Sequence, residues 1–428
     1  MMKSVNKLTI KVMLLFSAVL ILNLICNCGS ADIKTSAKVS LGIDILLDEH
    51  LDLIQGKRVG IITNQTGVNS DGKHIIDLVF EAPEVELTAL YGPEHGLRGD
   101  VEGGLTISHL VDPKTGVPIY SIYGKTKKPT PDMLQNVDVL IFDIQDVGAR
   151  FYTYISTMSL CMEAAAENQI SFIVLDRPNP ITGTLLEGPV LAPEYQSFVG
   201  IHPIALRHGM TVGELALMFN KERWLANGIQ VELHIVKMKN WRRDSWYGEL
   251  GLEWIKPSPN MPSATTALLY PGMGLLESCN VSEGRGTAAP FIQIGAPWLD
   301  HVRLKQLLDN AGVAGIQIDT VRFVPVDMPG AAMNPKFKGE TCLGLKLTVT
   351  EPHQFQSVAF GIHLISTIKQ LHPEHFKWRS PRSPLIMFGN DYTPAAIDAG
   401  EPPDSIVRSW QPELNQFEKI RAGYLLYE

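Results

Sequence analysis

The sequence is poor in cysteine and carries no excess of positive charge. Five cysteines occur in 428 residues, and two of them lie near the N-terminus. The other three, Cys161, Cys279 and Cys342, form no CxxC pair and no Cys/His pair at zinc-like spacing. A disulfide framework is therefore excluded, and we expect these three thiols to be buried as small apolar groups. Lys and Arg number 37 against 45 Asp and Glu, giving a net charge of −8, which disfavours nucleic-acid binding.

Several catalytic and cofactor motifs are also missing. No GxGxxG stands at a first strand–helix turn, no GxxxxGK[ST] occurs, and there is no GxSxG. Dinucleotide binding, a phosphate-binding loop and a serine-hydrolase elbow are thus disfavoured, and we expect no cofactor. The chain has no low-complexity segment and no internal repeat, so its length predicts two domains or one large one.

The N-terminus has the pattern of an export signal. Three lysines fall within the first eleven residues, and residues 12–25 form an apolar run that ends at Cys26 and Cys28. We expect residues 1–28 to be a signal segment of a lipoprotein, with Cys28 as the lipidated residue. Cys26, cleavage by the ordinary signal peptidase and an uncleaved anchor are the alternatives. The mature chain would then be periplasmic and touch a membrane only through its lipid anchor.

Short apolar runs alternate with helix-like stretches in the first half of the chain. Strands are predicted at residues 57–63, 85–91, 137–143 and 171–176, with helices at 73–81 and 151–168. The runs are apolar at consecutive positions, as in strands covered on both faces. This pattern predicts an α/β fold with a parallel sheet.

The second half continues the α/β pattern beyond a boundary expected between residues 185 and 211. Thr211 and Glu214 form a capping box ahead of a helix that runs to about residue 224. Residues 257–297 are rich in proline and glycine, and we expect ordered functional loops there. A strand at 345–349 and a helix at 354–371 follow.

Polar side chains follow four consecutive predicted strands. Ligands of open α/β sheets bind where the carboxyl ends of the strands converge, so these side chains predict a site. In chain order they are Asn64 and Gln65; Glu94 and His95; Asp143, Asp146 and Arg150; and Arg177 and Asn179.

The segment GPEHG at residues 92–96 is the most distinctive of these. Pro93 and the two glycines present Glu94 and His95 at a fixed angle, so Glu94 is the candidate acid or base. A helix-capping role for Glu94 is the structural alternative, and His95 is either an orienting residue or an ordinary loop residue. Asp143, Asp146 and His95 could together bind a metal, but a metal needs three or four converging ligands, and we expect none.

A later loop, NVSEGRGT at residues 280–287, offers Glu283 and Arg285 to an oxygen-rich ligand. The structural alternative is a tight turn in which these two side chains pair on the surface. Aromatic residues that could stack on a sugar ring flank these loops. They are Tyr123, Tyr152, Tyr154, Trp254, Tyr270 and Trp298.

Taken together, these segments resemble a bacterial family associated with exo-β-N-acetylmuramidase activity. The resemblance runs from about residue 41 to the C-terminus and includes GID at 42–44, TNQTG at 63–67, GPEHG at 92–96, DIQDVGARFYTY at 143–154, DRPNP at 176–180, EGP at 187–189, RHGMT at 207–211, PSPNMP at 257–262, YPG at 270–272 and EGRGT at 283–287. It implies a Rossmann-like catalytic domain at 41–205, a C-terminal α/β domain at 206–428 and an active-site cleft between them.

The implied activity is release of terminal N-acetylmuramic acid from the non-reducing end of peptidoglycan fragments, which would be the partner. Glu94 is the family's candidate catalytic residue, and we expect it to act as general acid. A second catalytic group is needed, and the lactyl carboxylate of the sugar needs a cation. For the second group the candidates are Asp143, Asp146, Glu187, Glu283 and the substrate's 2-acetamido group, and for the cation they are Arg150, Arg177 and Arg285.

We further expect Asn64, Gln65, Tyr152 and Asn179 to contact the substrate. Two other functions remain open from the sequence. One is a non-catalytic lipoprotein that binds peptidoglycan fragments in the same cleft. The other is a metal-dependent hydrolase built on Asp143, Asp146 and His95.

Overall fold

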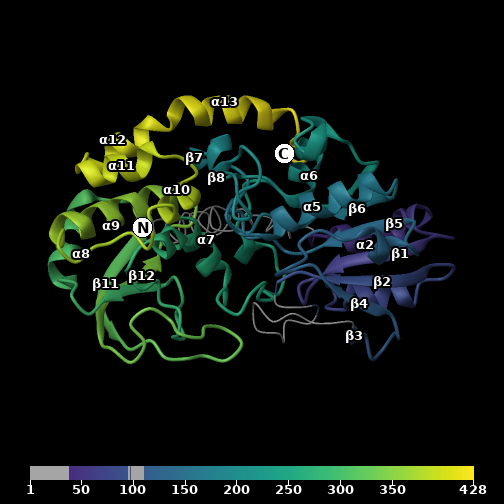
Figure 1. The fold of residues 1–428 in the computed structure, drawn as a ribbon, viewed down its shortest axis with the longest axis horizontal. Coiled ribbons are helices and arrows are strands. Elements are labelled where there is room, and N and C mark those ends of the chain that lie inside the picture. Colours follow the sequence, from purple (N-terminus) through teal and green to yellow (C-terminus); the bar gives the residue numbers. More distant parts are fainter. Residues whose placement is uncertain (1–37, 95–96, 98–109) are drawn as a thin grey trace, which may run out of the picture. The chain divides into compact units, whose positions relative to one another are not determined.

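The computed structural model describes residues 38–94, residue 97 and residues 110–428 (Figure 1). The predicted signal segment, with Cys26 and Cys28, lies outside the described residues, and so does His95. Residues 39–428 form one compact unit. No helix in this described part is both long and apolar enough to cross a membrane.

A seven-stranded sheet forms the first half of this unit. Its order is β3-β4-β2-β1-β5-β6-β9, and every pair is parallel except β3 with β4. Numbered along the chain, the six parallel strands lie in the order 3-2-1-4-5-6 that is typical of Rossmann folds, so the predicted fold class is confirmed. The strands are β1 (Arg58–Thr63), β2 (Glu86–Gly92), β3 (Leu110–Val111), β4 (Pro118–Ser121), β5 (Val139–Asp143), β6 (Ser171–Leu175) and β9 (Leu233–Val236).

The two faces of this sheet pack into different cores because alternate side chains point in opposite directions. In β5, Val139 and Ile141 belong to one core, while Leu140 and Phe142 belong to the other. Helices α2 (Gly42–Glu49) and α3 (Ile75–Phe80) pack against the sheet and contribute to the core that contains Val139 and Ile141. Helices α5 (Tyr154–Glu167) and α6 (Val212–Lys221) also pack against the sheet and contribute to the core that contains Leu140 and Phe142. A short α4 (Pro131–Leu134) precedes β5.

Two local features show why the sequence folds this way. Thr211 begins α6 with the predicted capping box: its hydroxyl accepts from the Glu214 amide at 3.2 Å, and its own amide donates to the Glu214 carboxylate at 3.0 Å. Gly42 begins α2, where a Cβ would lie 2.4 Å from the Asp176 backbone nitrogen. Only glycine allows α2 to approach the end of β6 so closely.

The second half contains a three-stranded antiparallel sheet of order β10-β12-β11. Its strands are β10 (Gln293–Ala296), β11 (Ile316–Phe323) and β12 (Cys342–Val349), and a separate ribbon pairs β7 (Glu187–Val190) with β8 (Ala205–Arg207). The helices are α7 (Ala264–Met273), α8 (His301–Ala311), α9 (Ser357–Leu371), α10 (Ser383–Phe388), α11 (Tyr392–Ala399), α12 (Pro403–Ser409) and α13 (Gln411–Ala422). Helix α13 extends from the region of α11 and α12 toward α6 (Figure 1).

Two expectations about this half need correction. The segment at 257–297 is not loop throughout, because α7, the short 3-10 helix η5 (Gly274–Ser278) and β10 lie within it. Pro271 stands inside α7, and the Gly272 amide donates to the Ser357 hydroxyl at 2.9 Å. The predicted boundary at 205/206 does not separate the two sheets, since α6 and β9 follow it and both pack with the first sheet.

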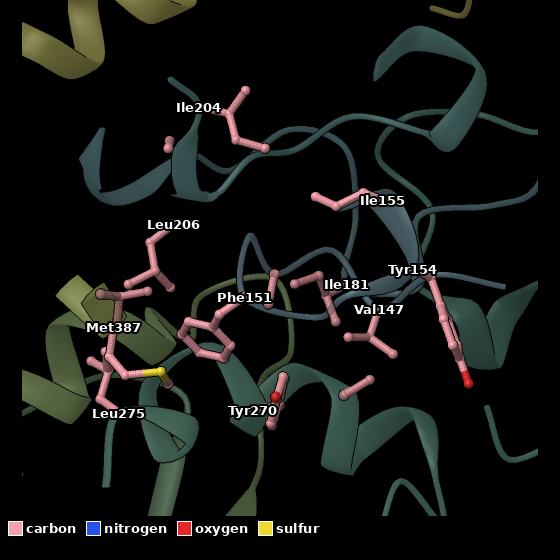
Figure 2. Packing of buried hydrophobic residues seen from close by; sticks show 14 of the residues in the cluster. Val147, Phe151, Tyr154, Ile155, Ile181, Ile204, Leu206, Tyr270, Leu275 and Met387 are labelled. Atoms are coloured by element: carbon pink, nitrogen blue, oxygen red, sulfur yellow. The ribbon is translucent and has the colours of Figure 1, made fainter. Parts of the chain in front are cut away.

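One hydrophobic cluster joins the two halves, as Figure 2 shows. Phe151, before α5, packs edge-to-face on Tyr270 of α7, with ring centroids 5.1 Å apart. Leu275 and Met387 of the second half and Leu206 of β8 belong to the same cluster. Cys161, Cys279 and Cys342 are free and buried, as predicted. The core therefore fixes the two halves against each other without a disulfide among the described residues.

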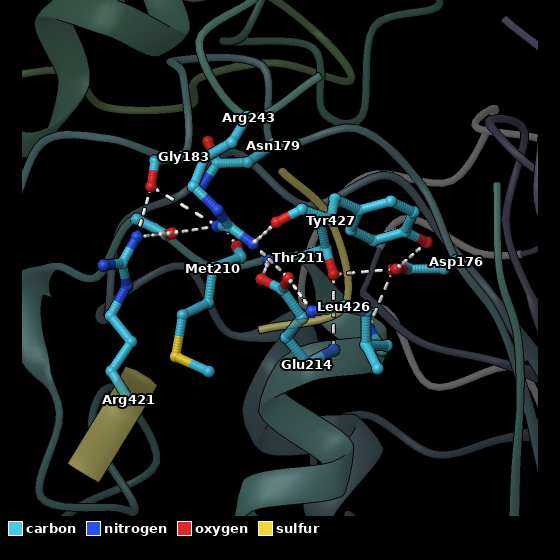
Figure 3. A network of polar contacts seen from close by, with 12 residues as sticks. Asp176, Asn179, Gly183, Met210, Thr211, Glu214, Arg243, Arg421, Leu426 and Tyr427 are labelled. Atoms are coloured by element: carbon cyan, nitrogen blue, oxygen red, sulfur yellow. Dashed lines mark hydrogen bonds and ion pairs between the residues drawn. The ribbon is translucent and has the colours of Figure 1, made fainter. Parts of the chain in front are cut away.

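The C-terminal tail returns to the end of β6 through a buried polar network (Figure 3). The Tyr427 hydroxyl donates to Asp176 at 2.6 Å, and Arg243 forms an ion pair with Glu214 in α6. Arg421 at the end of α13 donates to the Gly209 carbonyl at 2.7 Å. These bonds join the last residues of the chain to the first sheet.

Candidate active site

A cavity of about 830 Å³ lies between the two halves of the unit. Loops at the carboxyl ends of the first sheet form one wall, and loops around β10 and after β11 form the other. The side chains that line it from the first half include Glu94, Tyr123, Phe151, Tyr152, Tyr154 and Phe198. Those from the second half include Asn260, Tyr270, Glu277, Glu283, Arg285, Lys336 and Arg379.

Glu94 stands at this cavity directly after β2 and is only partly buried. The Tyr123 hydroxyl donates to Glu94 Oε1 at 2.8 Å. Burial, together with the charge of Glu94, raises the pKa of Tyr123, so the phenol stays protonated and keeps donating at neutral pH. One oxygen of Glu94 is therefore held by Tyr123.

Three tyrosines form an aromatic wall of the cavity. The ring of Tyr152 is edge-on to Tyr154 at 5.0 Å and to Tyr270 at 5.8 Å. The Tyr154 hydroxyl donates to the Pro257 carbonyl at 2.6 Å, and the Tyr152 hydroxyl is buried near Ser258. Burial raises the pKa of Tyr152 well above its ordinary value, so this hydroxyl remains protonated and able to donate.

Four charged side chains of the second half pair with one another in the cavity wall. Arg285 Nη2 lies 2.6 Å from Glu277 Oε1, and its Nε lies 3.7 Å from Glu283 Oε1. Lys336 Nζ lies 2.8 Å from Glu283 Oε2. Burial alone would raise the pKa of Glu283, but the nearby Lys336 and Arg285 outweigh it and lower that pKa. Glu283 is therefore ionised within a charge-balanced group of four, which we call the Glu283 quartet.

Asp143 and Arg177 do not line this cavity. They form a bidentate ion pair, with Arg177 Nε 2.5 Å from Asp143 Oδ1 and Nη2 2.9 Å from Oδ2. Asp143 is completely buried, and Arg177 faces a separate pocket of about 260 Å³ that Gln145 also lines. Their positions do not support the predicted catalytic and substrate-binding roles.

Asp146 and Asn64 are buried and also do not line the cavity. Asp146 Oδ2 accepts from the Gly148 amide at 2.7 Å and lies 3.7 Å from His208 Nε2. Asn64 Oδ1 accepts from both the amide and the hydroxyl of Thr66. Asp146 Oδ1 and Asn64 Nδ2 have no hydrogen-bond partner in the described structure. Both residues order the strand-end loops.

Arg150, predicted to bind the substrate carboxylate, is buried at 1% exposure. Its guanidinium donates to the carbonyls of Pro189 at 2.7 Å, Ile204 at 3.0 Å and Phe388 at 2.7 Å, and burial lowers its pKa to about 9. A guanidinium so occupied by backbone carbonyls joins β7, β8 and α10 and is not available to a ligand in the cavity. The geometry therefore does not support the predicted role of Arg150, because a strand-end position does not decide where a long side chain points.

The remaining predicted residues also make structural contacts. Gln65 donates to the Lys256 carbonyl at 2.7 Å, and Asn179 donates to the Met210 carbonyl at 3.0 Å. Glu187 pairs with Arg207 at 2.6 Å and accepts from the Val358 amide at 2.9 Å. Of the aromatic residues, Trp254 and Trp298 are not in the cavity lining. Across the described residues, no three His, Cys, Asp or Glu side chains converge as a metal site would require.

Several lining residues were missed from the sequence: Asn260, Glu277, Lys336 and Arg379. Asn260 belongs to the PSPNMP segment at residues 257–262, and its proline-rich composition could have indicated an ordered loop at the site. Glu277 lies in η5, inside a stretch expected to be loop. Lys336 lies in the segment after β11 and Arg379 in the segment after α9. Neither segment follows a strand of the parallel sheet, so the ends of those strands could not indicate these two residues.

This arrangement defines a class of enzyme. An α/β protein whose interdomain cavity combines a tyrosine-held glutamate, a second buried carboxylate and an aromatic wall has the groups that hydrolysis of a glycosidic bond requires.

Comparison with known proteins identifies the family. The N-terminal and C-terminal domains of the exo-beta-N-acetylmuramidase NamZ family match residues 59–265 and 268–427. The chain therefore belongs to the exo-β-N-acetylmuramidase family and is a glycosidase. It is 47% identical over 390 residues to the peptidoglycan beta-N-acetylmuramidase NamZ of Bacillus subtilis, covering 91% of this chain and 92% of that protein.

Two crystal structures of DUF1343 family proteins from Bacteroides fragilis share the fold. One has a TM-score of 0.84 and 37% identity, and covers 91% of this chain and 99% of its own. The other has a TM-score of 0.75 and 33% identity, and covers 92% and 99%. The family resemblance inferred from the sequence motifs is confirmed.

Proposed function

We propose that the cavity binds the non-reducing end of a peptidoglycan fragment and that Glu94 protonates the leaving oxygen as terminal N-acetylmuramic acid is released. The observation that carries this proposal is the position of Glu94 at the cavity, held through one oxygen by Tyr123 at 2.8 Å. A general acid must keep its second oxygen free to reach the glycosidic oxygen, and among the described residues only Tyr123 forms a hydrogen bond with the Glu94 carboxyl, through Oε1. The tyrosine wall offers a stacking surface for the sugar ring.

For the second catalytic group, the structure favours Glu283 among the four carboxylates considered. Asp143, Asp146 and Glu187 do not line the cavity, whereas Glu283 does. The cations of the Glu283 quartet keep Glu283 ionised, as a carboxylate that stabilises an oxocarbenium-like centre must be. The substrate's 2-acetamido group is the alternative partner for the anomeric carbon.

The test is Glu94→Gln, assayed for both turnover and binding. We expect hydrolysis of the disaccharide of N-acetylmuramic acid linked to N-acetylglucosamine to fall by a factor of about 10² or more, because general acid catalysis contributes about that much. Binding of a peptidoglycan disaccharide, followed by calorimetry, should persist. A wild-type chain that binds the disaccharide and turns over no muraminide would instead support the non-catalytic binding function.

Export and lipidation form a separate part of the proposal. The lysines, the apolar run and the cysteines near residue 28 support cleavage before Cys28 and its acylation, with the mature chain anchored in the periplasm. Intact mass of the protein from membranes tests this directly. A diacylated or triacylated chain that begins at Cys28 is expected, and an unmodified chain with another N-terminus would contradict it.

A further inference from the structure

The substrate of the proposed function carries a carboxylate, and most cations near the cavity are already occupied. N-acetylmuramic acid differs from N-acetylglucosamine by a 3-O-lactyl group, whose carboxylate needs a positive partner when it leaves water. Arg150 donates to three backbone carbonyls at 3.0 Å or less, and Arg177 is paired with Asp143. Neither lines the cavity.

The two cations of the Glu283 quartet are also compensated. Arg285 lies 2.6 Å from Glu277 and 3.7 Å from Glu283. Lys336 places all three ammonium donors on protein acceptors: the Leu276 carbonyl at 2.7 Å, the Val281 carbonyl at 3.0 Å and Glu283 at 2.8 Å. Because two carboxylates balance these two cations, the quartet gives the cavity no net positive charge.

Arg379 differs from these four. It lines the same cavity, its side chain is exposed, and it has no ion pair or side-chain hydrogen bond among the described residues. Its backbone is nevertheless fixed, because the Arg379 amide donates to the Ser278 carbonyl at 2.7 Å. Next to it, Lys377 and Asn280 exchange hydrogen bonds at 3.0 and 2.8 Å.

We propose that Arg379 binds the lactyl carboxylate of N-acetylmuramic acid and is a specificity-determining residue of the site. The inference rests on the proposed function. A guanidinium on a fixed backbone can form two parallel hydrogen bonds to a carboxylate, which gives both charge and orientation. Since its charge is unpaired in the described structure, binding the substrate requires no ion pair to be broken first.

The test compares two substrates that differ only in this charge: a chromogenic β-N-acetylmuraminide with a free lactyl carboxylate, and the same compound as its lactyl carboxamide. The variants are Arg379→Gln and Arg379→Lys, with Arg382→Gln as the matched control. Arg382 is also an exposed arginine, three residues further on, and does not line the cavity. Circular dichroism and the thermal midpoint establish that each variant is folded.

We expect the wild-type chain and Arg382→Gln to prefer the carboxylate substrate by a factor of about 10 or more in kcat/KM, the usual strength of a hydrogen bond to a charged group. Arg379→Gln should lose this preference through a raised KM for the carboxylate substrate, and Arg379→Lys should keep part of it. A folded Arg379→Gln that retains the wild-type preference would overturn this inference and leave the proposed function intact. A wild-type chain that hydrolyses neither muraminide would overturn both.

Discussion

The buried ion pair between Asp143 and Arg177 gives the sharpest prediction about what holds the strand ends together. Asp143 has no exposed surface, Arg177 is 4% exposed, and two bonds of 2.5 and 2.9 Å join them. Both carboxylate oxygens accept only from this guanidinium in the described structure. Arg177→Gln therefore leaves a buried carboxylate without its charge partner.

The expected cost is about 3–5 kcal/mol in the free energy of unfolding, the range for breaking a buried pair by removing one partner. Urea denaturation followed by tryptophan fluorescence measures it, since urea does not screen charges as guanidinium does. The control is Arg58→Gln. Arg58 pairs with Asp138 at 2.7 Å, but both side chains are 41% exposed, so its loss should cost less than about 1 kcal/mol.

Asp143→Asn combined with Arg177→Gln should cost less than the sum of the two single changes, because the double variant leaves no unpaired charge. A double variant that costs as much as the two single changes added together would show that the two side chains do not stabilise the fold as a pair. If Arg177→Gln unfolds within about 1 kcal/mol of the wild-type chain and yet loses turnover, Arg177 acts on a ligand, as its strand-end position first indicated.

Two further predictions concern packing and pH. Burial raises the pKa of Asp176 to about 6, above the value near 3.9 that an aspartate has in an unfolded chain. The protonated Asp176 therefore stabilises the fold fully below about pH 4, and this stabilisation is lost as the pH rises through 6. When wild-type and Asp176→Asn chains are compared, the difference between their free energies of unfolding should thus change by up to about 3 kcal/mol between pH 4 and 7. A difference that stays the same at every pH would contradict this prediction. In Gly272→Ala, a Cβ would lie 1.9 Å from the Ser357 carbonyl oxygen, so we expect α7 and α9 to separate and about 1–3 kcal/mol or more to be lost. Gly423→Ala, where the nearest atom is 3.4 Å away, is the control, and equal urea midpoints for the two variants would show that this contact is not tight.

The sheet could be predicted because its strands are buried on both faces. Runs such as VLIF in β5 are apolar at consecutive positions, and the helices between them carry capping and alanine-rich patterns that depend only on neighbouring residues. Helix α7 could not be predicted in the same way. It contains Pro271 and Gly272, residues that disfavour a helix locally, and its stability comes from packing on α9 and from the Ser357 hydroxyl.

The site was predicted only in part, for a related reason. Glu94 lines the cavity because it lies two residues after β2 and its side chain is shorter than that of an arginine. Arg150 and Arg177 were placed in the site although long side chains reach several residues away, and both reach buried acceptors instead. Arg379 and Lys336 enter the cavity from loops distant in sequence, and which loops meet there depends on how the second half packs against the sheet.

Hydrolysis by Glu94→Gln of two substrates with different leaving groups tests the central claim most directly. One is the disaccharide of N-acetylmuramic acid linked to N-acetylglucosamine, and the other is a nitrophenyl β-N-acetylmuraminide. A sugar alkoxide must be protonated as it leaves, whereas nitrophenolate leaves readily without a proton. If Glu94 is the general acid, the variant loses a factor of about 10² or more on the disaccharide and much less on the nitrophenyl substrate. Equal losses on both substrates would contradict that role and assign Glu94 to binding or to the anomeric carbon.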